Sequence, residues 1–294
     1  MNQPRHTKSA ARLLAASLAI AAGMVAPMPP AQATTDVVNP TVLLPNMVVS
    51  EGDAGRAAFT VNVGLSAPNP FDHPVRLEVV DYSAVPLPGG GGTYGTATPG
   101  TDYVAFGSFY LTFQPGQQVA RFKVRIKGDK VIEPSEEIDV RFDDTEFVVG
   151  DNDIDLVLGN DDGVGPKPSR PLLLPPNQTM PEPDTGCFAY HVTIPVNRPV
   201  QALSTVEAVD FTTIPLPPPG VGTYGTATPG ADYQTFATRT LTYRVGSRVA
   251  VLPVTLCGDT VAEPNEEVDV RFDNTTTIAI TDNDIDLVLA DNDA

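Results

Sequence analysis

The sequence predicts an all-β protein built from two tandem β-sandwiches, and three observations support this prediction. First, the segment Lys127–Phe142 returns almost unchanged 130 residues later as Cys257–Phe272. Second, the 294 residues include 30 Pro and 24 Gly but no Trp, a composition suited to short strands and turns. Third, apolar and polar residues alternate over short runs, and no long segment has the 3.6-residue period of a helix. The chain is long enough for two domains of ordinary size.

The first 33 residues predict an export signal. Arg5, Lys8 and Arg12 precede the apolar run 13–26, and small residues follow for cleavage near Ala33. The run is short for a membrane span, and no later segment is apolar enough to anchor the chain. We therefore expect a secreted or periplasmic protein with no membrane span.

The chain is strongly acidic, with a formal net charge of −18 at pH 7. Residues 1–33 carry three cations and no acid, so their removal lowers this charge to −21. A protein with this charge repels nucleic acid and attracts cations. Metal ions are therefore expected partners, and nucleic acid is not.

Residues 40–162 are predicted to form the first domain. Ala57, Phe59, Val61 and Val63 alternate with polar residues, which is the period of a half-buried strand. Further strands are expected at 75–82, 109–113, 120–127, 138–142 and 154–158. About seven short strands separated by turns are typical of an immunoglobulin-like Greek-key sandwich.

Residues 163–171, rich in Pro and Gly, are predicted to form a linker, and residues 172–294 repeat the pattern as the second domain. There, Phe188, Tyr190 and Val192 occupy the inward positions of a strand. The predicted fold is therefore two tandem seven-stranded immunoglobulin-like Greek-key sandwiches after an N-terminal signal peptide.

Acidic residues recur in the same order at the turns of both domains. In the first, Glu51 and Asp102 lie in turns, the loop 129–136 carries three acids, and Asp162 follows the last strand. Such turns share one pole of a sandwich, where clustered carboxylates are costly unless a cation neutralises them. Calcium accepts about 6–8 oxygen ligands in irregular geometry, whereas three histidines in the whole sequence argue against zinc. The alternative is that these acids are ordinary surface turns, but their repetition favours a site.

Four motifs resemble the Calx-beta domain, a module of sodium/calcium exchanger regulatory loops and of many extracellular and bacterial surface proteins. They are Val49-Ser-Glu-Gly-Asp53, Gly95–Tyr103, Leu111–Gly116 and Asp129-x3-Glu-x2-Glu136, and the terminal pair Asp161-Asp162 resembles the domain as well. The resemblance covers roughly 45–162 and 175–293, and implies a seven-stranded sandwich with calcium at one pole. By position, the implied ligands are Glu51, Asp102, Asp129, Glu133, Glu136, Asp161 and Asp162, then Glu182, Asp232, Asp259, Glu263, Glu266, Asp291 and Asp293.

This sequence departs from the family at two points. Lys130 and Thr260 stand where the family often has a further Asp, and Asn160 and Asn292 interrupt the terminal acidic run. These departures imply weaker or fewer ions. An ion held by Asp161 and Asp162 is also expected to fix the point where the linker leaves the first domain and to narrow the range of angles between the two domains.

Cys187 and Cys257 have outward parity on neighbouring antiparallel strands of the expected second sandwich. A disulfide between them suits an exported protein, and two free thiols are the alternative. Asp139 has outward parity too and is interpreted as an ordinary surface acid. The stripe Arg121, Lys123, Arg125 and Lys127 is interpreted as a solvated sheet face, with a docking site for an anionic polymer as the alternative.

The sequence favours a non-catalytic, calcium-binding module with a structural or adhesion role. Its acids are duplicated in two domains, whereas an enzyme concentrates its chemistry in one asymmetric cleft, and we find no nucleophile elbow, phosphate loop or zinc signature. The expected partners are calcium ions and a cell-surface protein or polysaccharide. The alternatives are a metal-free spacer or inhibitor on the same fold, and a carboxylate-dependent hydrolase.

Overall fold

The computed structural model describes residues 38–163, 169–218, 220 and 222–293, and every regular element among them is a β-strand. The all-β prediction is therefore confirmed. The predicted export signal, residues 1–33, lies outside the described residues, as does much of the predicted linker. Within the described part of the chain, no helix has the length and hydrophobicity needed to cross a membrane.

The first repeat, residues 38–163, contains seven longer strands and two short ones among its described residues. The longer strands are β2 (Asn46–Ser50), β3 (Gly55–Leu65), β4 (Val75–Asp81), β6 (Ser108–Phe113), β7 (Val119–Gly128), β8 (Glu136–Asp143) and β9 (Asp153–Gly159). The short ones are β1 (Val42–Leu43) and β5 (Tyr103–Val104).

These strands form two layers that enclose one core. One layer has the strand order β2-β9-β8-β4-β6, and the other has the order β1-β3-β7-β5. Leu77 and Val140 from the first layer and Phe59 and Val124 from the second are fully buried in the same cluster. Each such side chain contributes about 1.5–3 kcal/mol on burial, so the core holds the two layers together.

The second repeat, residues 169–293, has the same architecture. Its strands are β10 (Asn177–Pro181), β11 (Gly186–Pro195), β12 (Ser204–Asp210), β13 (Tyr233–Gln234), β14 (Arg239–Tyr243), β15 (Val249–Gly258), β16 (Glu266–Asp273) and β17 (Asp284–Ala290). The layers have the orders β14-β12-β16-β17-β10 and β11-β15-β13. A second core, which includes Tyr190, Val254 and Leu287, lies between them.

Strand direction defines an acidic pole in each repeat. In the first repeat β2 runs parallel to β9, and both end at the pole where the antiparallel strand β8 begins. The pair β3 and β7 is also antiparallel, with β3 starting and β7 ending at this pole. The loops 51–54, 129–135 and 160–162 therefore meet there, as the sandwich topology predicted.

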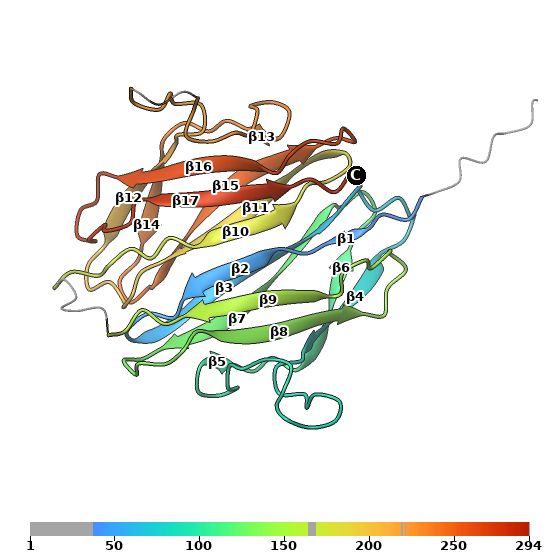
Figure 1. Cartoon of the computed structure of the whole chain (residues 1–294), viewed down its shortest axis with the longest axis horizontal. Coiled ribbons are helices and arrows are strands. Elements are labelled where there is room, and N and C mark those ends of the chain that lie inside the picture. The colour runs from blue at the N-terminus through green and yellow to red at the C-terminus, as the bar shows by residue number, and fades with distance from the viewer. Residues whose placement is uncertain (1–37, 164–168, 219, 221, 294) are drawn as a thin grey trace, which may run out of the picture. The chain divides into compact units, whose positions relative to one another are not determined.

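The two repeats are joined directly by strand pairing, which the sequence did not reveal. Strands β2 and β10 are antiparallel, with Val48 opposite Asn177 and Asn46 opposite Thr179, so the two larger layers form one ten-stranded sheet. Figure 1 shows β2 in blue beside β10 in yellow. Strands β2 and β10 each end at the acidic pole of their own repeat. Because they run in opposite directions, the two poles lie at opposite ends of the strands in the shared sheet. Backbone hydrogen bonds between β2 and β10 therefore restrain the arrangement of the repeats in addition to any ion at Asp161 and Asp162.

Candidate metal centre

The acidic pole of the first repeat holds two clusters of carboxylates. Cluster A consists of Glu51, Asp129 and Asp162, and cluster B consists of Asp102, Glu133 and Glu136. Within each cluster, one oxygen from each residue lies within 4.8 Å of the others. Glu51 and Asp102 are each only 5% exposed, so each cluster has a buried floor.

The acidic pole of the second repeat holds one such cluster among the described residues. Cluster C consists of Asp232, Glu263 and Glu266, the counterparts of cluster B. The four other predicted ligands line the same pole. The backbone amide of Asp259 donates to Glu182 Oε1 at 3.1 Å, and that of Asp293 donates to Asp291 Oδ1 at 3.0 Å. Their oxygens are thus close to cluster C without forming a fourth group of three.

Local turns fix the backbone that carries these acids. Asp129 Oδ1 accepts a hydrogen bond from the Val131 amide at 2.7 Å, and Asp259 Oδ1 accepts one from the Val261 amide at the same distance. Asp side chains commonly stabilise turns in this way. Asp161 also lies at the pole, where its Oδ1 accepts a hydrogen bond from the Gly52 amide at 2.8 Å.

The repeated Gly-Asp pair at the end of β7 and β15 has a steric cause. A Cβ at Gly128 would lie 2.1 Å from the Gly52 carbonyl oxygen, and one at Gly258 would lie 2.0 Å from the Pro183 carbonyl oxygen. Only glycine lets the strand end approach the loop that carries Glu51 or Glu182 this closely. The glycine therefore belongs to the site geometry in both repeats.

Burial and mutual repulsion raise the pKa values of the clustered acids. Burial, followed by repulsion from Asp129, raises the pKa of Glu51 to about 7. Burial likewise raises the pKa of Glu182 to about 7. The pKa values of Glu136 and Glu266 are raised by burial and then by a hydrogen bond to Asp102 or Asp232, respectively. Without a cation, these carboxyl groups therefore tend to hold protons near neutral pH.

The donor atoms at these poles fit calcium. Among the described residues, Glu51 Oε1, Glu266 Oε2 and Asp293 Oδ2 are buried side-chain oxygens without a hydrogen-bond partner. Buried polar atoms are nearly always paired, so three unpaired carboxylate oxygens at the acidic poles are suited to accept a partner such as a cation. Hard oxygen donors in irregular loops are the ligands that calcium prefers. When bound, the ion would supply charge neutralisation.

The prediction that Asp139 is an ordinary surface acid is wrong. Asp139 is 3% exposed and accepts two hydrogen bonds from Arg141, from Nε and Nη2, each at 3.0 Å. The Arg141 guanidinium lies over the rings of Tyr82 and Tyr94, at 4.8 and 4.4 Å from their centroids. Tyr94 follows the Pro- and Gly-rich loop 86–92, and its ring covers the Arg141 side chain on the outer face of β8. Strand parity was right, but this part of the outer face is covered.

The basic stripe is only partly a solvated face. Lys123 and Arg125 are exposed, as expected. Arg121 is partly buried instead, because its guanidinium donates to Asn62 Oδ1 at 3.0 Å and to the Ala189 carbonyl of the second repeat. This side chain therefore belongs to the contact between the repeats.

The predicted disulfide between Cys187 and Cys257 is present. The two residues face each other across β11 and β15, as their parity required. Cys187 is exposed, whereas Cys257 is only 5% exposed.

Two acids near the poles were missed in the sequence. Asp53 is 5% exposed, and its Oδ2 accepts a hydrogen bond from Asn197 Nδ2 at 2.7 Å. Asp184 accepts one from Asn292 Nδ2 at 3.2 Å and raises the pKa of Asp293, after burial has done so. Both follow a predicted ligand by two residues, as Glu-Gly-Asp and Glu-Pro-Asp, and this shared spacing was the signal available.

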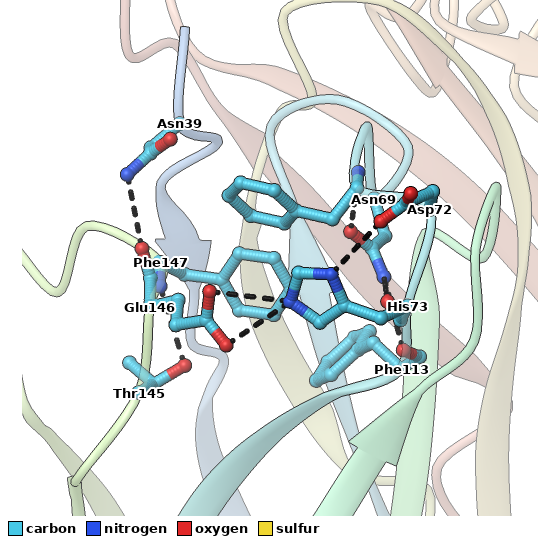
Figure 2. Close-up of polar contacts among 9 residues, drawn as sticks. Asn39, Asn69, Asp72, His73, Phe113, Thr145, Glu146 and Phe147 are labelled. Atoms are coloured by element: carbon cyan, nitrogen blue, oxygen red, sulfur yellow. Dashed lines mark hydrogen bonds and ion pairs between the residues drawn. The ribbon is translucent and has the colours of Figure 1, made fainter. Parts of the chain in front are cut away.

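The opposite end of the first repeat carries an unrelated ionic group around His73. Figure 2 shows the His73 ring between Asp72, whose Oδ1 lies 3.1 Å from Nδ1, and Glu146, whose carboxylate oxygens lie 3.3 Å from Nε2. These hydrogen bonds raise the pKa of His73. The two carboxylates approach different ring nitrogens of His73, so this group links the loop at residues 72–73 to the loop at Glu146 through hydrogen bonds and does not form a metal site.

Comparisons with known proteins find one family and several solved structures that are similar to this chain. The Calx-beta domain profile matches residues 92–161 and 221–292, and a search of curated proteins returns no match. Among solved structures, the chain is similar to CBD12 from CALX1.2, with 17% identity over 80% of this chain and 81% of that one and a TM-score of 0.32. It is also similar to the calcium binding domain CBD12 of CALX1.1, with 15% identity over 81% of this chain and 82% of that one and a TM-score of 0.32. The apo form of the Calx CBD1 domain is similar with 21% identity over 41% of this chain and 98% of that one, and a TM-score of 0.30.

Identities and TM-scores this low carry no information on function. The profile is more specific, since the two matched segments contain clusters B and C together with Asp129 and Asp259. The chain therefore carries two Calx-beta domains, one in each repeat.

Proposed function

We propose that this protein is an exported, non-catalytic calcium-binding module in which calcium stabilises the acidic pole of each repeat. The observation that carries the proposal is cluster A, where the buried oxygen Glu51 Oε1 has no hydrogen-bond partner among the described residues. Clusters B and C supply two further groups with the same chemistry. The proposed ligands are the fourteen acids identified by position in the sequence.

The role of the ions would be structural. Each cluster brings three carboxylates together, and their repulsion opposes the closure of loops that come from distant parts of the chain. A divalent cation would convert this repulsion into attraction and lock the loops at the strand ends. The cystine supports an oxidising location outside the cytoplasm, where calcium is at millimolar levels in many settings. A rigid module of this kind suits adhesion to a cell-surface protein or polysaccharide.

Thermal unfolding tests this proposal. We expect millimolar calcium to raise the melting temperature of the full chain relative to EDTA, because extracellular modules bind calcium at around 10⁻⁴–10⁻³ M. At about 100 times its Kd, each ion would add about 2.7 kcal/mol to the free energy of unfolding.

Magnesium at the same concentration is the control. It demands octahedral geometry at shorter distances, so it should raise the melting temperature much less. Identical curves in EDTA and calcium would refute the metal proposal and favour a metal-free spacer, whereas equal shifts with both ions would indicate general charge screening.

A further inference from the structure

The cystine lies beside cluster C and is bonded to the backbone of one of its ligands. Cys187 and Cys257 link the start of β11 to the end of β15. The Cys257 amide donates to the Asp232 carbonyl oxygen at 2.7 Å, so the cystine is one hydrogen bond from a cluster C residue. Two residues later the chain reaches Asp259, whose amide is bonded to Glu182.

The first repeat has the same backbone bond but no cystine. The Lys127 amide donates to the Asp102 carbonyl oxygen, also at 2.7 Å. Arg56 and Lys127 occupy the two positions that correspond to the cystine, facing each other across β3 and β7. The Lys127 ammonium donates to the Gly100 carbonyl, two residues from the cluster B residue Asp102.

Clusters B and C therefore have matched ligands in different surroundings. The cystine joins β11 and β15 covalently next to Asp232, which limits the motion that calcium binding would have to arrest. In the first repeat Arg56 and Lys127 stand at the two corresponding positions, so no covalent link joins β3 and β7 there. This difference favours cluster C.

We propose that the cystine is a positioning element for cluster C, so that cluster C binds calcium more tightly than cluster B and fills first. This inference rests on the proposed calcium-binding function. It adds an order of loading to two sites with the same ligand types, and it assigns the Cys187–Cys257 pair a role in affinity as well as stability.

Calorimetric calcium titration of the full chain tests the order of loading. Cluster C is measured in a Glu136→Gln background, which disables cluster B, and cluster B is measured in a Glu266→Gln background. We expect cluster C to bind about 2- to 10-fold more tightly, because the cystine already restrains a group that calcium binding must otherwise immobilise. Replacing both cysteines by serine should remove most of that advantage and leave cluster B unchanged.

A reciprocal exchange provides the matched control. Arg56→Cys with Lys127→Cys places a cystine at the corresponding position beside cluster B and should tighten that site. Arg56→Ser with Lys127→Ser removes the same two charges without adding a brace. The proposal requires the cysteine pair to gain more affinity than the serine pair, and equal gains would overturn it in favour of charge alone.

Amide hydrogen exchange in EDTA gives a readout that needs no bound ion. The Cys187→Ser, Cys257→Ser protein should exchange faster at residues 229–233 and 258–263, with no change at residues 99–103. A variant with a lower melting temperature but unchanged cluster C affinity and exchange would overturn the inference, because the cystine would then be purely structural. A wild-type chain that binds no calcium would overturn the proposed function as well, which separates the two failures.

Discussion

The buried pair Asp139 and Arg141 allows fold stability to be separated from metal binding within one strand. Replacing Asp139 by Asn keeps the shape of the side chain but removes its charge and one of its two acceptor oxygens. Arg141 is 25% exposed and stays stacked on its aromatic neighbours, so water recovers only part of the loss. One charge-assisted hydrogen bond is worth about 1.5–3 kcal/mol, and we expect a cost of about 2 kcal/mol.

The assay is thermal unfolding of Asp139→Asn in EDTA and again in calcium. For two repeats joined in one ten-stranded sheet, a loss of about 2 kcal/mol corresponds to a melting temperature lower by about 4–8 °C. The increment that calcium adds should equal that of the unaltered chain, because Asp139 lies outside clusters A and B. The reasoning would be refuted by a variant with unaltered stability in EDTA, or by one that loses the calcium increment.

Three further predictions concern the poles. Glu136→Gln should abolish the stabilisation due to an ion at cluster B, whereas Asp143→Asn, exposed at the other end of β8, should not; equal losses on titration calorimetry would indicate a diffuse charge effect. In EDTA, the free energy of unfolding should fall as pH rises from about 4.5 to about 7, because Glu51, with a pKa of about 7, keeps its proton in the folded chain and loses it in the unfolded chain. Saturating calcium should remove this pH dependence. Melting temperatures measured across that pH range, with and without calcium, check both expectations. Gly128→Ala should lower the free energy of unfolding by at least about 1–3 kcal/mol and weaken calcium binding, because its Cβ would meet the Gly52 carbonyl oxygen. Gly150→Ala is the control, since the nearest atom to its Cβ would lie 4.0 Å away. In the same melting and titration assays it should change neither stability nor calcium binding.

Much of the fold was predictable because the strands obey a period of two. The inward set of the β3 strand, Ala57, Phe59, Val61 and Val63, is buried as the alternation required. The parity of Cys187 and Cys257 placed both on one face of adjacent strands, and the disulfide followed from it. Local sequence is sufficient here because each side chain has only two faces to choose between.

The candidate site was predictable in outline because the chain repeats it. The same order of acids in both repeats indicated a site, and the resemblance to the Calx-beta domain implied fourteen ligands, of which nine form clusters A, B and C. Which acids share a cluster depends on loop paths that strand parity does not determine. The missed acids Asp53 and Asp184 show this, since each is placed by contacts outside its own loop.

Contacts between distant segments could not be predicted from local pattern. The burial of Asp139 depends on Tyr94 returning over β8 after a loop rich in Pro and Gly. The pairing of β2 with β10 leaves no periodic signal, because the polar side chains of Asn46, Asn177 and Thr179 read as ordinary outer-face positions. Arg248, 2% exposed, donates to the Glu51 carbonyl at 2.6 Å across the same contact, and nothing in its sequence neighbourhood indicates burial.

Direct measurement of bound calcium by equilibrium dialysis is the most decisive test of the central claim. The account predicts saturable binding in the millimolar range or tighter, with about three ions per chain, one for each of clusters A, B and C. The triple variant Glu51→Gln, Glu136→Gln, Glu266→Gln should bind almost none while keeping its β-sheet circular dichroism. Binding that fails to saturate, or that is equal in the unaltered and triple-variant chains, would contradict the claim that these clusters are calcium sites.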